Sequence, residues 1–194
     1  MSQICIISAS QRAGSNSRRI SDVLNQHYLG GQASLIDLQR DPLPFWDGDT
    51  AENTAVEDAR SKAQAADGFV FVVPEWHGMV PAALKNLLLW LGSKELAHKP
   101  VLLTAVSASA GGAFVIAELR GSGYKNSRLL YLPEHLILRD ANDLWQGQEE
   151  RESDAYLDKR ARYAIDQLTT YATALAPLRE QLTAGLTDFA NGMS

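Results

Sequence analysis

The chain has 194 residues, 45% of them hydrophobic and 21% charged, so it can bury a sizeable core and is predicted to form one domain over 1–194. Its single cysteine, Cys5, excludes a disulfide scaffold and a zinc site built from several thiolates. A net charge of −5 and the lack of a long apolar run argue against nucleic acid and membrane partners, so a cytoplasmic protein is expected.

In the first part of the chain, apolar runs of strand length alternate with helical stretches. The run 4–7 is predicted as a strand, and 17–29 follows as an amphipathic helix. A second strand at 33–38 leads into the segment 41–51, which contains two prolines and two large aromatic residues and therefore cannot be a regular helix. This segment is expected either to pack against the domain or to cover a ligand. A polar helix over 54–66 comes next.

The middle of the chain carries the strongest strand pattern. Residues 68–74 form an uninterrupted, β-branched and aromatic run that predicts the central strand of a sheet. A helix over 82–91 begins after a proline, and a fourth strand is predicted at 101–106. The small residues after it open a helix that runs to about Gly121.

A fifth strand at 129–138, interrupted or preceded by Pro133, and a long helix from about 149 to 182 complete the pattern. Strands that alternate with helices are typical of βαβ units, so the predicted fold is α/β: a doubly wound, five-stranded parallel sheet with helices on both faces. Such sheets bind ligands at the carboxyl ends of their strands, near the point where the strand order reverses. The loops after the first, third and fourth strands are therefore the candidate site.

The loop after the first strand is rich in groups that bind phosphate. Residues 8–19 contain four serines, one asparagine and three arginines ahead of a predicted helix start. Hydroxyl, backbone N–H and guanidinium groups are the donors that a phosphate monoester needs. Neither G-x-x-x-x-G-K-[ST] nor G-x-G-x-x-G occurs, which favours a terminal monophosphate over a triphosphate or a dinucleotide. A serine-rich turn that only caps the helix through Ser15 or Ser17 is the structural alternative.

Two motifs in the chain resemble those of one known family. Ser10, Arg12 and Ser15 match G-S-x-R-x-x-S-x-N, the signature of the NADPH-dependent FMN reductase family, although Ala9 replaces its glycine. Residues 74–86, P-E-W-H-G-M-V-P-A-A-L-K-N, are similar to the family's P-E-Y-N-x-x-x-P-x-x-L-K-N. The resemblance implies a flavodoxin-like fold that binds FMN.

The three loops supply the expected contacts with FMN. The first would hold the phosphate, backbone groups of the second would meet the edge of the flavin ring, and the helix start after the third would stabilise negative charge on the reduced ring. The predicted cofactor-binding residues are Ser10, Arg12, Ser15, Asn16, Ser17, Pro74, Glu75, Trp76, His77, Gly78, Ser107, Gly111 and Gly112. The three arginines of the first loop are expected to concentrate positive charge at the phosphate.

The expected activity is that of an FMN-dependent NAD(P)H oxidoreductase. NADPH or NADH would deliver a hydride to flavin N5, and a quinone, a flavin or a similar small molecule would accept it. Hydride transfer to an oxidised flavin requires no acid or base, so no catalytic side chain is assigned. A non-enzymatic, flavodoxin-like electron carrier is the alternative, and a phosphate-binding module without flavin is a weaker one.

The helix after the second motif is unusually apolar. Residues 87–91 read L-L-L-W-L, with Leu89 where relatives commonly have aspartate. A helix that is apolar on most sides needs partners beyond its own sheet, so we expect a subunit interface in a homodimer or homotetramer. Burial of this helix within a monomer is the alternative.

Overall fold

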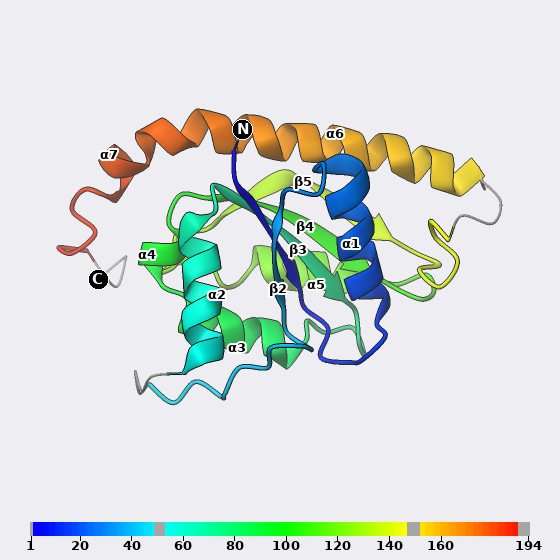
Figure 1. Ribbon diagram of the computed structural model, residues 1–194, viewed down its shortest axis with the longest axis horizontal. Helices are drawn as coiled ribbons and strands as arrows, with labels where there is room; N and C mark the ends of the chain where they lie inside the picture. Colours follow the sequence, from blue (N-terminus) through cyan, green and yellow to red (C-terminus); the bar gives the residue numbers. More distant parts are fainter. Residues whose placement is uncertain (1, 49–52, 147–151, 190–194) are drawn as a thin grey trace.

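The five predicted strands form one parallel sheet in the order β2-β1-β3-β4-β5 (Figure 1). The computed structural model describes residues 2–48, 53–146 and 152–189. The strands are β1 (Ile4–Ser8), β2 (Ser34–Asp37), β3 (Gly68–Pro74), β4 (Pro100–Val106) and β5 (Leu130–Leu138). This is the strand order of flavodoxin-like folds, which confirms the predicted fold class.

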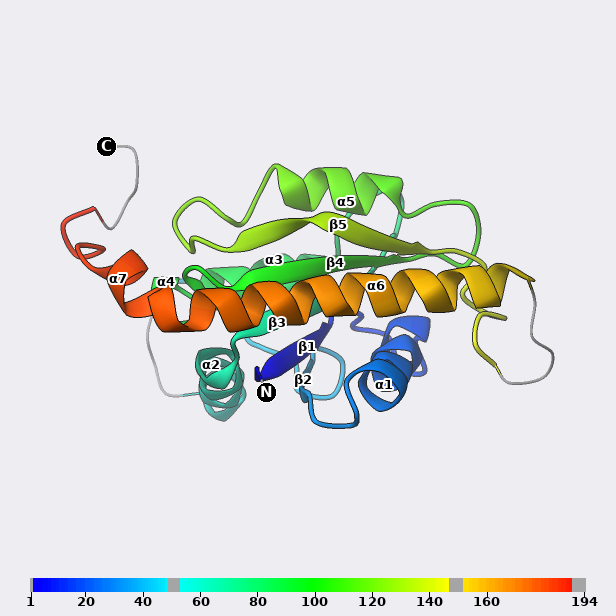
Figure 2. The same cartoon turned by 90° about the horizontal axis from the view of Figure 1, so that it is seen from above.

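Helices cover both faces of the sheet. They are α1 (Asn16–Tyr28), α2 (Thr54–Ala65), α3 (Ala82–Trp90), α4 (Ser93–Leu96), α5 (Ala113–Arg120), α6 (Glu152–Leu175), the 3₁₀ turn η1 (Ala176–Leu178) and α7 (Arg179–Thr183). The buried side chains of α1 and α6 pack on one face, while those of α2, α3 and α5 pack on the other. The long α6 runs alongside the sheet (Figure 2).

The central strand β3 shows why its sequence is uninterrupted and apolar. Phe69, Phe71 and Val73 belong to the core beneath α2, α3 and α5, whereas Val70 and Val72 belong to the core beneath α1 and α6. A strand that is buried on both faces is typically a near-continuous apolar run. The core therefore consists of two layers that share this strand.

Two prolines affect the last helix and the last strand. The last helix does not continue to 182, because α6 ends at Leu175 and a 3₁₀ turn containing Pro177 separates it from α7. Its predicted start, near 149, lies outside the described residues. Strand β5 runs through Pro133, and its register shifts there: Val101 lies opposite Tyr131, and Leu103 opposite His135. A bulge accommodates a proline because that residue need not donate to the ladder.

The fold brings the three candidate loops to one edge of the sheet. Ser8, the last residue of β1, lies opposite Val72, and Pro74, the last residue of β3, lies opposite Val106 of β4. The order reverses between β1 and β3, so the loops after these strands flank the switch point where such sheets bind ligands. Among the described residues, no helix combines the length and the apolar character needed to cross a bilayer.

Candidate functional site

The loop after β1 presents a row of hydrogen-bond donors at the start of α1. The Oγ atom of buried Ser10 accepts the N–H of Arg12 at 3.1 Å, and Ser15 Oγ caps the helix by accepting the N–H of Arg18 at 3.2 Å. Each hydroxyl therefore keeps its own proton to donate. Within the described ranges, the backbone N–H groups of residues 13–17 make no hydrogen bond. Free donors at a helix N-terminus fit the oxygens of a phosphate.

Arg18 does not supply positive charge to this loop as expected. Its guanidinium group contacts Asp22 at 3.0 Å and the buried carboxylate of Asp37 at 2.6 Å. Hydrogen bonds with these two carboxylates raise the pKa of Arg18. Arg18 therefore joins α1 to the end of β2, and its charge is compensated there.

Arg19 is also engaged away from the phosphate loop. Its guanidinium group donates to two backbone carbonyl oxygens in the segment 139–146, at 2.5 and 2.8 Å. Arg12 is exposed, and its guanidinium group forms no hydrogen bond or ion pair with the described residues. Carboxylates therefore compensate the charge of Arg18 alone, while Arg19 keeps its charge near the loop but uses its donors elsewhere. Arg12 is the arginine of this loop whose guanidinium group is free to bind a phosphate.

Asn16 and Ser17, at the start of α1, have different environments. Asn16 Nδ2 donates to Asn142 Oδ1 at 2.8 Å, which ties the phosphate loop to the chain after β5. The Ser17 hydroxyl is buried and has no partner within the described part of the chain. A buried hydroxyl without a partner costs about 1–3 kcal/mol. A bound group could supply the missing partner of Ser17, whereas the Asn16 amide is already in use.

The loop after β3 contains a tight turn. Met79 N donates to Trp76 O at 2.9 Å, and Trp76 N donates to Met79 O at 3.3 Å. Both residues between them have positive φ, 53° at His77 and 71° at Gly78, which is the geometry of a type I′ turn. Asparagine, the family residue at position 77, and histidine both tolerate positive φ better than most residues. The backbone of this loop is therefore fixed, while the His77 side chain is exposed.

Glu75, the first residue of this loop, reaches the start of α5. Its Oε2 atom accepts the N–H groups of Gly112 at 2.9 Å, Phe114 at 3.1 Å and Val115 at 3.4 Å. The helix start that we expected to face the flavin ring is thus already paired with a carboxylate. This contact brings the loops after β3 and β4 together.

The two glycines of the loop after β4 are each required for a different structural reason. A Cβ atom on Gly111 would lie 2.6 Å from Glu75 Oε1 and 3.0 Å from Ser107 Oγ. Gly112 has φ of 106°, and a Cβ atom there would lie 2.6 Å from Ile137 Cγ2. The pair therefore allows the loop to pack closely against both β5 and the Glu75 carboxylate.

The segment 139–146 after β5 is part of the site and was not predicted. Arg139 Nε donates to Gly111 O at 3.0 Å, and Ala141 N donates to Ser107 O at 3.0 Å. With the contacts to Asn16 and Arg19, this segment links the phosphate loop to the loop after β4. No motif signals it, because its role depends on β5 lying beside β4.

The proline-rich loop after β2 is packed down at its centre. Pro44 O accepts hydrogen bonds from Asn86 Nδ2 and Trp90 Nε1, both at 2.8 Å, and Trp46 N donates to Asn86 Oδ1 at 2.8 Å. Phe45 nevertheless remains 85% exposed. A cavity of about 250 Å³ beside it is lined by Gln11, Leu38, Pro42, Leu43, Phe45, Ala82, Ala83 and Asn86. The loop is therefore anchored to α3 through the backbone of Pro44 and Trp46, while most side chains of 44–48 are exposed, so the expected choice between packing and covering a ligand stays open; residues 49–51 lie outside the described part.

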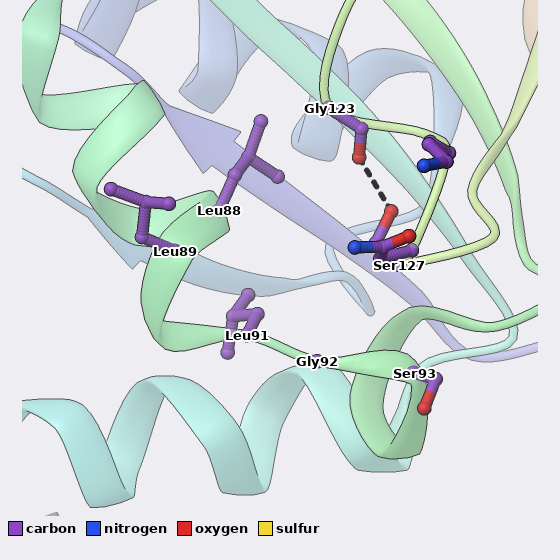
Figure 3. Close-up of a pocket in the computed structure, with 9 residues that line it drawn as sticks. Leu88, Leu89, Leu91, Gly92, Ser93, Gly123 and Ser127 are labelled. Carbon is purple, nitrogen blue, oxygen red and sulfur yellow. Dashed lines mark hydrogen bonds between the residues drawn. The ribbon is translucent and has the colours of Figure 1, made fainter. Parts of the chain in front are cut away.

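The apolar end of α3 is largely used inside the chain. Leu87, Trp90 and Leu91 are buried, whereas Leu89 is 56% exposed. Leu88 and Leu89 line a cavity of about 490 Å³ between the end of α3 and the connection from α5 to β5, where Ser127 Oγ donates to Gly123 O (Figure 3). The protein's own core therefore accounts for most of the apolar run.

Comparison with known proteins agrees with the motifs. Residues 2–143 match the family described as NADPH-dependent FMN reductase. This chain belongs to that family. Its relatives include the NADPH azoreductase of Bacillus sp. (strain OY1-2), which is 32% identical over 112 residues, or 57% of this chain. The chain spans 61% of that azoreductase.

Two further similarities cover more of the chain. The NADH-dependent flavin reductase subunit 2 of Lactobacillus johnsonii is 27% identical over 146 residues, 75% of this chain and 77% of that protein. An oxidoreductase of Corynebacterium diphtheriae of known structure superposes with a TM-score of 0.72 at 20% identity, covering 90% of this chain and 98% of the other. The latter similarity shows a shared fold.

Proposed function

We propose that this member of the FMN reductase family is an FMN-dependent NAD(P)H oxidoreductase with one FMN-binding domain over 1–194. The observation that carries the proposal is the row of free N–H donors at residues 13–17, placed at the switch point of a flavodoxin-like sheet. Membership of the family supports FMN as the phosphate compound.

Different residues of the site would bind the phosphate and the ring of FMN. The hydroxyl groups of Ser10 and Ser15, the N–H groups of 13–17 and the Arg12 guanidinium group would bind the phosphate. The backbone of 75–78, fixed by its turn, would meet the edge of the ring. When bound, FMN supplies the hydride chemistry between the nicotinamide nucleotide and the acceptor.

The cofactor and the enzymatic activity are tested on the purified protein. Any bound chromophore is released by heat and identified, and the holoprotein is titrated with NADPH and NADH in the absence of oxygen. Bleaching of the flavin spectrum by either nucleotide supports the oxidoreductase. A flavin that responds to neither supports the electron carrier, and a protein that binds phosphate but no FMN contradicts both.

The class of acceptor is proposed from the site and the relatives. Relatives are named for azo dyes and flavins, which, like quinones, are planar conjugated molecules. The exposed Phe45 beside a cavity at the phosphate loop offers an apolar surface to such a molecule. Steady-state rates with a quinone, an azo dye and free flavin, each with NADPH and NADH, would rank the acceptors and the donors.

We further propose that the chain forms a homodimer or homotetramer in the cytoplasm. The exposed Leu89 next to the cavity at the end of α3 supports self-association there. Light scattering coupled to size-exclusion chromatography measures the mass, and Leu89→Asp should shift it toward the monomer. A monomeric wild-type protein at micromolar concentration contradicts this proposal.

A further inference from the structure

Glu75 joins two parts of the proposed flavin site that lie far apart in the sequence. Glu75 directly follows β3. Its Oε2 atom accepts hydrogen bonds from three N–H groups at the start of α5, at 2.9, 3.1 and 3.4 Å. The first N–H groups of a helix have no partner within the helix. A side chain from one loop therefore completes the helix start that follows the other loop.

The Glu75 carboxylate is closely packed against the loop after β4. Gly111 is needed beside it, because a Cβ atom at that position would lie 2.6 Å from Glu75 Oε1. A second carboxylate holds the other end of the same loop: Glu118 Oε2, on α5, accepts the N–H of Val80 at 2.8 Å. Both ends of the segment 75–80 are thus tied to α5.

The carboxylate also reverses the local electrostatics. A helix N-terminus is equivalent to about half a positive charge, whereas the carboxylate brings a full negative charge to the same atoms. Arg139, from the segment after β5, brings a positive side chain to the loop after β4, where its Nε atom donates to Gly111 O at 3.0 Å. The start of α5 by itself would favour negative charge on a reduced flavin, and Glu75 opposes that effect.

We propose that Glu75 is a positioning residue of the flavin site with two separable effects. Its hydrogen bonds fix the segment 75–80 that meets the ring, and its negative charge lowers the reduction potential of the bound flavin. This inference rests on the proposed FMN-dependent function. Glu75 would thus set the conformation of the segment 75–80 and make the reduced flavin a stronger electron donor. A lower reduction potential suits an enzyme that passes electrons on to an acceptor.

Two substitutions separate the effects. Glu75→Gln keeps a carbonyl oxygen that can accept the N–H groups but removes the charge, whereas Glu75→Ala removes both. Glu180→Gln, on exposed α7, is the matched control for loss of one negative charge elsewhere. FMN affinity is measured by the quenching of flavin fluorescence, the potential by equilibration with a reference dye, and apoprotein stability by thermal unfolding.

We expect the potential to become more positive in both Glu75 variants. Reduced FMN should gain about tenfold in affinity relative to oxidised FMN, which for a two-electron couple corresponds to about 30 mV. Oxidised FMN should bind to Glu75→Gln within about twofold of wild type, because the glutamine oxygen can still accept N–H groups at the start of α5. It should bind to Glu75→Ala about tenfold more weakly, because alanine removes the acceptor. The apoprotein should unfold at a lower temperature in Glu75→Ala than in Glu75→Gln.

The outcomes are distinguishable. Wild-type protein that binds no FMN contradicts the proposed function and this inference with it. If wild type binds FMN but the potential is unchanged in both variants, the electrostatic effect is wrong. Equal FMN affinity and equal unfolding temperature in the alanine and glutamine variants would overturn the positioning effect. A shift in Glu180→Gln as large as that in Glu75→Gln would attribute the change in potential to net charge alone.

Discussion

Gly112→Ala is expected to destabilise the protein far more than Gly111→Ala, although the two residues are neighbours in the same loop. At position 112 the backbone has φ of 106°, which an L-residue adopts only with strain of about 1–3 kcal/mol. The new Cβ atom would also lie 2.6 Å from Ile137 Cγ2. Forcing a methyl group into packed surroundings costs about another 1–3 kcal/mol.

The free energy of unfolding should therefore fall by about 2–6 kcal/mol, a large part of the roughly 5–15 kcal/mol typical of a domain. At position 111 no positive φ is required, and the new Cβ atom meets the ends of the Glu75 and Ser107 side chains, which can shift at the cost of the Glu75 hydrogen bonds. The loss there should be about 1 kcal/mol, the usual value of a helix cap.

Urea denaturation followed by circular dichroism measures both variants. The double variant Gly112→Ala/Ile137→Ala separates the two causes, because it relieves the overlap and leaves the backbone strain. The reasoning is wrong if Gly112→Ala costs less than about 1 kcal/mol, or if the two glycine variants are equally stable.

Three further predictions address the phosphate loop, the loop after β2 and the loss of stability at acidic pH. Arg12→Ala should weaken FMN binding by about 1.5–3 kcal/mol in fluorescence titrations, because a charged hydrogen bond to the phosphate is lost. The unfolding temperature should not change, since the exposed guanidinium group forms no hydrogen bond or ion pair with the described residues; unchanged affinity would exclude Arg12 from the site. Asn86→Ala should cost about 1–3 kcal/mol in urea denaturation and speed proteolysis of 41–48, since Pro44 loses one of its anchors; resistance equal to wild type would contradict this anchoring. A hydrogen bond with Arg160 lowers the pKa of Glu134, so its stabilising effect is present above about pH 4.5 and is lost as the pH falls through the lowered value. Glu134→Gln should flatten the decline of the melting temperature between about pH 5 and 3; a decline as steep as in wild type would contradict this role.

The layout of the sheet was predictable from the sequence because it rests on local patterns. An uninterrupted apolar run such as 68–74 fits only a strand that is buried on both faces, and the structure divides its side chains between two cores. Helix boundaries depended on local signals too, and the last helix was predicted too long because Pro177 was not used as a stop.

The candidate loops were predictable as well, because the spacing of serine, arginine, glycine and proline in them is a property of the chain. The positions of Ser15 as the cap of α1 and of Gly78 in a tight turn follow from what those residues do locally. The sequence by itself therefore determined which segments meet at the carboxyl edge of the sheet and which family they resemble.

Tertiary structure decided what each side chain is free to do. Arg18 is paired with Asp37, Asn16 bonds Asn142 across 126 positions, and Glu75 completes a helix start 37 positions later. Such contacts depend on which strands are neighbours and on how far each helix is turned, and no local pattern encodes either. The same strand order that gathers the three loops also leaves Arg12 as the free cation among the arginines of the phosphate loop and places a carboxylate where the sequence alone had predicted an uncompensated helix dipole.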